Sequence, residues 1–188
     1  RAANGVILVT TKQGKTGKVT TSYDGSIGWQ NMTSIPKQLT AKQYMDIKDM
    51  TNINDGKAPH DWAAFIPADI LAAYQDGSNP GTDWLEMLRN KNAVTTSHSL
   101  NVTGGSELSK FSTGIGYQYQ DGIIGGSLAP SDFRRFTFRL NSEHILLKKG
   151  DRNVITFGEN VYYQHRENKG IQIGNMYSNA IYSMLHTA

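Results

Sequence analysis

Residues 110–120, KFSTGIGYQYQ, alternate between two kinds of side chain. The mainly apolar and aromatic series is Phe111, Thr113, Ile115, Tyr117 and Tyr119. The small and polar series is Ser112, Gly114, Gly116, Gln118 and Gln120. Because successive side chains of a β-strand point to opposite faces of its sheet, this period of two predicts a strand with one apolar and one polar face.

Four other segments show the same alternation: KVTTSYDGSIGWQ, SHSLNVTGG, RRFTFRLNSEH and NVITFGENVYYQ. We therefore expect five antiparallel strands, near 18–30, 97–105, 110–121, 133–145 and 152–165. Each has roughly ten residues, which is longer than the usual five or six and is the length of a tilted membrane-spanning β-strand.

The connections between these strands are unequal in length. GGSEL at 104–108 and KKGD at 148–151 are tight turns, whereas the links at 31–96 and 121–132 are long. Short turns at one rim and long loops at the other are typical of outer-membrane barrels. Aromatic residues gather toward the strand ends that meet the long links, as a girdle would: Trp29, Tyr117, Tyr119, Phe136 and Tyr163.

A soluble β-sandwich that serves as a carbohydrate-binding module is the alternative, because its strands alternate equally well around an apolar core. Glu159 also argues against a lipid-facing surface, since it falls in the apolar series of its strand unless a bulge or a place near the rim accommodates it. The favoured prediction is an all-β fold that forms part of a large antiparallel transmembrane β-barrel.

The long link at 31–96 carries helix signals. Thr40 and Gln43 have the spacing of a capping box. Pro67 suits a first helical turn, and Gly77 suits the end of the same helix. Thr82 is the expected cap of a third short helix. The link is therefore expected to be a folded, helix-containing loop.

The composition excludes several classes of protein. Lys and Arg number 19 against 16 Asp and Glu and are scattered, whereas a nucleic-acid-binding domain needs a concentrated basic face. No apolar run approaches the ~20 residues of a membrane-spanning helix. Cysteine is absent, and the histidines lack metal-ligand spacing. The neighbouring His60 and Asp61 more often mark a solvated turn than a metal site, and the loop with Asp76, Ser78 and Asp83 lacks calcium-loop spacing. We expect no catalysis, cofactor, metal or nucleic-acid partner.

The opening segment RAANGVILVTTKQGK, residues 1–15, resembles the end of the plug in TonB-dependent outer-membrane receptors of the SusC/RagA type. Further pieces are similar to this family in the family's own order: QLTAKQYMDI, GTDWLEMLRN, SHSLNVTGGSELSKFSTGIGYQYQDGII and RRFTFRLN. The likeness runs from Arg1 to about Lys149 and is specific as an ordered set.

This resemblance implies that residues 1–16 end a plug domain and that residues 17–188 begin the barrel, with 31–96 as an extracellular loop. It implies a place in the bacterial outer membrane, in contact with lipid and with the remainder of the same barrel. It also implies import of an oligosaccharide or peptide with a SusD-like surface lipoprotein. The TonB complex would bind a segment that is not in this chain.

Two groups of residues are candidates for ligand binding. Gln118, Gln120, Arg139 and Asn141 fall in the polar series, where they would contact either a ligand or the plug. Trp62 and Trp84 in the long link can stack on sugar rings, but large aromatics more often anchor their own helices.

Overall fold

The computed structural model describes residues 14–127, 129–171 and 182–183. The chain divides into two compact units. The first holds residues 1–30, 92–122 and 132–169, and the second holds 31–91, 123–131 and 170–188. The predicted plug segment, 1–16, lies outside the described residues except for its last three.

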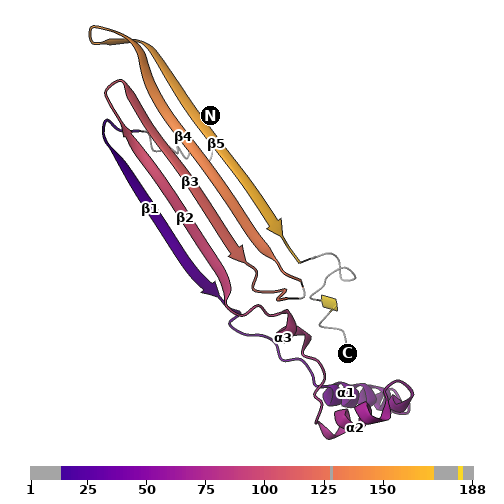
Figure 1. The fold of residues 1–188 in the computed structure, drawn as a ribbon. Coiled ribbons are helices and arrows are strands. Elements are labelled where there is room, and N and C mark those ends of the chain that lie inside the picture. The colour runs from indigo at the N-terminus through magenta and orange to yellow at the C-terminus, as the bar shows by residue number, and fades with distance from the viewer. Residues whose placement is uncertain (1–13, 128, 172–181, 184–188) are drawn as a thin grey trace. The chain divides into compact units, whose positions relative to one another are not determined.

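The first unit is a five-stranded antiparallel sheet in which every strand pairs with its neighbour in sequence (Figure 1). Its strands are β1 (Gly17–Gln30), β2 (Ala93–Gly105), β3 (Ser109–Asp121), β4 (Asp132–Lys149) and β5 (Arg152–Lys169). The predicted all-β class is confirmed, because helices occur only in the second unit among the described residues.

Three strands are longer than their sequence patterns indicated. β2 begins at Ala93 rather than near 97, because residues 93–96 pair with residues 27–30 of β1. β4 and β5 continue to Lys149 and Lys169, respectively, since each pairs with the other over nearly its full length. Pairing with a neighbouring strand, which the sequence of one strand does not contain, sets these boundaries.

Cross-strand register gives the sheet one apolar face. Leu100 pairs with Tyr23 and with Ile115, and Phe138 pairs with Ile115 and with Tyr163. Directly paired residues share a face, so this row crosses all five strands on one side. The side chains remain open, with Tyr23 63%, Ile115 45% and Tyr163 54% exposed. We call this side the apolar face.

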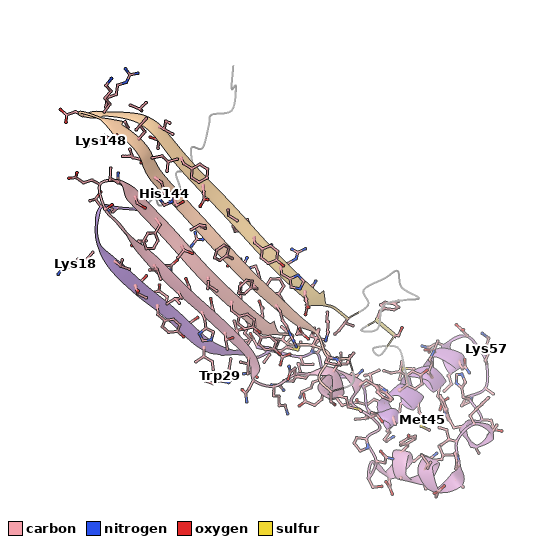
Figure 2. All side chains as sticks on the ribbon, turned by 45° about the horizontal axis from the view of Figure 1, so that its top comes forward. Lys18, Trp29, Met45, Lys57, His144 and Lys148 are labelled. Carbon is pink, nitrogen blue, oxygen red and sulfur yellow. The ribbon has the colours of Figure 1, made fainter. Side chains whose placement is uncertain are left out.

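The opposite side is hydrophilic along an equivalent row. Asn101 pairs with Ser22 and with Gly114, and Arg139 pairs with Gly114 and with Tyr162. We call this side the polar face. The sheet carries side chains on both faces along its whole length (Figure 2).

The second unit contains the helices α1 (Ala41–Asn54), η1 (Trp62–Ala64), α2 (Ala68–Asp76) and α3 (Trp84–Leu88). We call residues 31–91 the insertion. The predicted capping box is confirmed, since Thr40 and Gln43 each bond the other's backbone N–H. Gly77 ends α2 with φ of 80°. Asp83, and not Thr82, caps α3, because its carboxylate accepts the Glu86 N–H at 2.9 Å.

Among the described residues of the second unit, the most buried side chain is that of Leu88, at 2% exposure. The segment 123–131 lies against it, with the Gly125 N–H donating to the Leu88 carbonyl at 2.7 Å and Ile124 bridging to Arg89. No helix among the described residues is long and apolar enough to cross a membrane.

Candidate functional site

The predicted ligand-binding residues of the sheet all lie on the polar face but form separate contacts. Gln118 accepts a hydrogen bond from Arg135 at 2.8 Å, and Gln120 donates to Gln30 at 3.3 Å. These contacts cross between neighbouring or next-neighbouring strands near the ends that lead to the long connections. Gln118 and Gln120 therefore order the polar face there and present amides along it.

Arg139 belongs to a second group nearer the middle of the strands. Its guanidinium donates to the Asn101 side-chain oxygen at 3.4 Å, and the Asn101 amide donates to Ser99 at 3.0 Å. A hollow of about 220 Å³ opens beside this group, and Gly114 and Gly116 form its floor.

Neighbouring side chains lie directly over the two glycines, in the space that a Cβ would occupy. A Cβ on Gly114 would be 2.7 Å from the Asn101 amide oxygen, and one on Gly116 would be 2.6 Å from the Thr137 hydroxyl. The hollow is lined by two arginines, Arg135 and Arg139, and by the hydroxyl-bearing residues Ser99, Thr137 and Tyr162, which suits a polar ligand or a polar protein segment.

Asn141 lies apart from Arg139, in a hollow of about 260 Å³ near the end of the sheet that carries the short turns. Lys110, Glu143 and Gly14 also line it. Gly14 passes so close to β3 that a Cβ on it would be 2.4 Å from the Phe111 amide nitrogen. The stretch that leads into β1 therefore crosses this part of the sheet.

The two candidate tryptophans are brought together in the insertion. Trp62 and Trp84 line one cavity of about 670 Å³. Its other aromatic lining residues are Tyr44, Phe65 and Tyr74. The wall is mainly apolar and aromatic, as in sites that hold rings or aliphatic groups.

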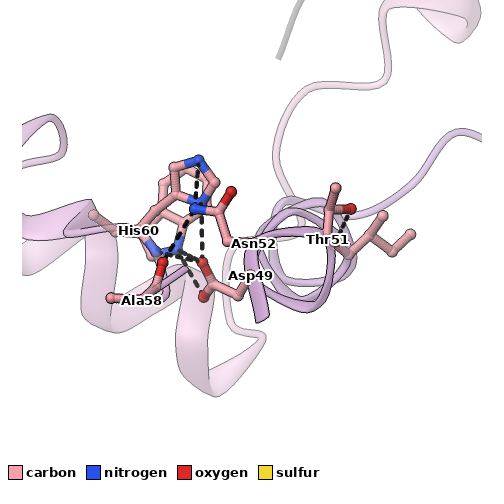
Figure 3. Close-up of polar contacts among 7 residues, drawn as sticks. Asp49, Thr51, Asn52, Ala58 and His60 are labelled. Carbon is pink, nitrogen blue, oxygen red and sulfur yellow. Dashed lines mark hydrogen bonds and ion pairs between the residues drawn. The ribbon is translucent and has the colours of Figure 1, made fainter. Parts of the chain in front are cut away.

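Trp62 is also fixed by hydrogen bonding, through a cluster around Asp49 that sequence reasoning missed. Figure 3 labels Asp49 and His60 of this cluster. The Asp49 carboxylate accepts the Trp62 indole N–H at 3.0 Å and the His60 backbone N–H at 2.9 Å. The His60 ring nitrogen lies 3.2 Å from the same carboxylate. The His60 and Trp62 rings have centroids 4.9 Å apart. His60 is thus paired with Asp49 on α1 rather than with its neighbour Asp61.

The Trp62 indole N–H, followed by the His60 backbone N–H, holds the pKa of the Asp49 carboxyl below its ordinary value, because both bonds favour the ionised form. No sequence signal revealed this cluster, since Asp49 and His60 are eleven positions apart and fit no motif. It anchors the tryptophan while leaving part of the ring on the cavity wall.

The described residues contain no cluster of three or more His, Asp or Glu side chains suited to holding a metal ion. In the loop 76–83, Asp76 accepts the Ser78 N–H at 2.7 Å, as in an ordinary turn. Hydrogen bonding from Ser78 lowers the pKa of Asp76.

Comparison with known proteins finds that this chain is similar to TonB-dependent receptors, although no family model matches it. The TonB-dependent receptor SusC of Bacteroides thetaiotaomicron is 30% identical over 142 residues, which is 75% of this chain. The TonB-dependent receptor P39 of Formosa agariphila is 30% identical over 97% of this chain. The chain spans 12% and 16% of the lengths of these two relatives.

A solved structure of the RagAB peptide transporter shares the fold, with a TM-score of 0.67 at 21% identity over 98% of this chain and 22% of the solved chain. The sequence similarity to TonB-dependent receptors and the structural similarity to the solved transporter therefore agree. The chain belongs to the SusC/RagA-type TonB-dependent receptors.

Proposed function

We propose that this chain forms one part of the wall of an outer-membrane transporter, with the apolar face of β1–β5 in contact with lipid and the polar face toward a plugged lumen. This proposal rests on the row of apolar and aromatic side chains that crosses the sheet on one side: Tyr23, Leu100, Ile115, Phe138 and Tyr163. A water-soluble sheet must cover such a face, and among the described residues no second sheet does so. The soluble sandwich is therefore not favoured.

Within this proposal the polar face holds either the plug or the imported compound. Arg139, Asn141, Gln118 and Gln120 offer one cation and three amides along that face. Residues 1–16 would form the last part of the plug, and the passage of Gly14 beside Phe111 supports a plug that enters the barrel wall there. The whole receptor would import an oligosaccharide or a peptide, driven by TonB.

The insertion would be extracellular, because it joins β1 to β2 at the ends opposite the short turns. We propose that a SusD-like lipoprotein contacts it. Ile47, Met50 and Ile53 recur along one side of α1 with 49%, 61% and 57% exposure, and Phe65 has 78%. Exposed apolar residues on that scale support a protein partner.

Single cysteines in a cysteine-free full-length receptor test the orientation of the sheet. Cysteine at Leu100 or Ile115 should react with a maleimide confined to the bilayer and resist a membrane-impermeant one. Ser112 and Thr137 lie nearby on the polar face. Cysteine at either position should resist the maleimide confined to the bilayer and react with the membrane-impermeant one. Equal reaction of both pairs with the water-soluble reagent in intact cells would contradict a lipid-facing sheet.

A second measurement tests the transport role. Deleting the full-length gene should abolish growth on the nutrient that the receptor imports, and the intact gene should restore it. Comparison of uptake of labelled oligosaccharides with that of labelled peptides then identifies the substrate class. Growth that is unchanged on every oligomeric nutrient tried would contradict an import function.

A further inference from the structure

The hairpin between β4 and β5 extends beyond the rest of the sheet. β3 begins at Ser109, which pairs with His144, and the Ile145 N–H donates to the carbonyl of Leu108 in the β2–β3 turn at 2.7 Å. Beyond Ile145, β4 pairs only with β5. Residues 145–156 therefore form a two-stranded ribbon, which projects past the β2–β3 turn (Figure 1). We call this segment the ribbon. It closes at Gly150, whose φ is 59°.

The ribbon has an apolar base that does not follow strict alternation. Leu146 and Leu147 are 65% and 49% exposed, and Val154 and Ile155 are 48% and 49% exposed. Two register shifts between Ile145 and Lys148 interrupt the alternation here. Consecutive large apolar side chains on both strands would be costly in water, so the base is suited to an apolar medium.

The tip of the ribbon is cationic. Lys148, Lys149 and Arg152 are exposed, and Asp151 is the single acid between them. Within the part of the chain that the structure describes, none of these three cations has an ion-pair partner. The label of Lys148 marks this tip in Figure 2, at the far end of the sheet from Trp29.

The position of the ribbon along the sheet matches a membrane boundary. On β3 the stretch from Tyr119 to Ser109 has about the ten residues with which a tilted strand crosses the hydrocarbon layer. Ser109 pairs with His144, so the ribbon begins where that layer would end. The headgroup zone occupies about the next 5–8 Å. Lys148 and Lys149 follow His144 closely, and lysine stems bend readily to that depth.

We propose that the ribbon is a binding site for anionic phospholipid headgroups in the periplasmic leaflet, with its apolar base at the boundary between acyl chains and headgroups and its three cations on phosphate. Charge complementarity selects this occupant, because a cationic tip above an apolar base matches an anionic lipid at both levels. A water-soluble acidic protein would leave the apolar base uncovered. The inference rests on the proposed outer-membrane function.

Lipid titration of the full-length receptor tests this inference. The delipidated receptor in detergent is mixed with dioleoylphosphatidylglycerol or dioleoylphosphatidylcholine, and native mass spectrometry counts the bound lipids. Each cation near a lipid surface strengthens binding about fivefold. We expect the wild type to prefer phosphatidylglycerol at least about tenfold and the triple variant Lys148→Gln, Lys149→Gln, Arg152→Gln to lose that preference.

The matched control changes three lysines of the insertion instead, Lys42→Gln, Lys48→Gln and Lys57→Gln, and should keep the preference. Loss in the ribbon variant alone supports the site. Retention in both variants, or loss in both, overturns it. Cell fractionation separates this inference from the proposed function. If the receptor is found in the outer membrane but its preference for phosphatidylglycerol is unchanged in the ribbon variant, only the lipid site is contradicted. If the receptor is found elsewhere, both the lipid site and the proposed function are contradicted.

Discussion

Asp49 shows how one carboxylate organises the insertion. It collects the backbone N–H of His60 and the indole N–H of Trp62 from a segment that follows α1, and so ties that segment to the helix. Hydrogen bonds to an ionised acceptor are stronger than those between neutral groups. The charge on Asp49 is therefore part of the local structure, which makes the insertion sensitive to acid.

We predict an acid transition in the insertion that depends on Asp49. Its pKa is lowered from 3.8 on folding, so its stabilising effect is complete above that value and is lost as the pH falls through the lower folded pKa. Hydrogen exchange of residues 41–66 in the full-length receptor, corrected for intrinsic pH effects, should accelerate only below about pH 4. Asp49→Asn should remove this transition, and an identical transition in that variant would contradict the assignment.

Gly125 illustrates a position where no other residue fits. Its φ is 116°, and a Cβ would lie 2.0 Å from the Ala129 carbonyl oxygen. We expect Gly125→Ala to destabilise the contact with Leu88 by more than about 1 kcal/mol. The measurement is hydrogen exchange of α3. Gly28→Ala, whose Cβ would meet nothing within 4 Å, is the control and should leave α3 unchanged.

At the scale of elements, neighbouring strands compensate for an acid on the apolar face. Glu159 on β5 accepts a hydrogen bond from Ser142 on β4 at 3.1 Å, and His144 lies 3.1 Å from the same hydroxyl. The other ring nitrogen of His144 is 2.7 Å from Ser109 on β3. This chain of polar groups crosses three strands beside the ribbon, near the boundary rather than the middle of the apolar band. Such a position explains how a carboxylate is tolerated there.

Removing the central hydroxyl should weaken these strands. Ser142 is 6% exposed, so Ser142→Ala leaves Glu159 without its donor at a cost of about 1–3 kcal/mol. We expect the full-length receptor to lose its folded mobility on semi-native gels at a lower temperature. Ser112→Ala removes a hydroxyl from the polar face and serves as the control. Equal melting of both variants would show that the polar chain contributes nothing specific.

The capping box of α1 gives a prediction for the helices. Thr40→Ala removes the acceptor of the Gln43 N–H, which costs about 1 kcal/mol of helix stability. Exchange should accelerate in the first turn of α1 and less at its far end. Thr51→Ala removes a hydroxyl that bonds the Ile47 carbonyl within the helix, and it should leave the first turn protected.

For the molecule as a whole, the two faces of the sheet should respond oppositely to charge. Ile115 lies in the middle of the apolar row, so Ile115→Arg should cost about 2–4 kcal/mol and reduce the folded receptor in the outer membrane. Thr137→Arg, on the polar face one pair away, should fold to near the wild-type amount. Quantitative blotting of outer-membrane fractions checks both. A lower yield for Thr137→Arg than for Ile115→Arg would reverse the assignment of the faces.

Sequence periodicity predicted the five strands and their faces, because the alternation of apolar and polar residues is present in the sequence of each strand by itself. Strand ends were predicted less well, since the start of β2 at Ala93 depends on its partner β1. The cap of α3 was misplaced by one residue, because Thr82 and Asp83 are both good caps and only local geometry selects one. The Asp49 cluster and the cavity beside Trp62 and Trp84 arise from tertiary contacts that leave no local pattern.

The direct pairing of Gln30 with Ala93 makes the pairing of β1 and β2 independent of the residues between them. The ladder fixes where the intervening polypeptide departs and returns, and closing a longer flexible loop adds little entropic penalty. The intervening segment can therefore be replaced by one of another length or composition without a change in the pairing of β1 with β2. Related chains can therefore differ between Gln30 and Ala93 while the sheet keeps the same strand pairing.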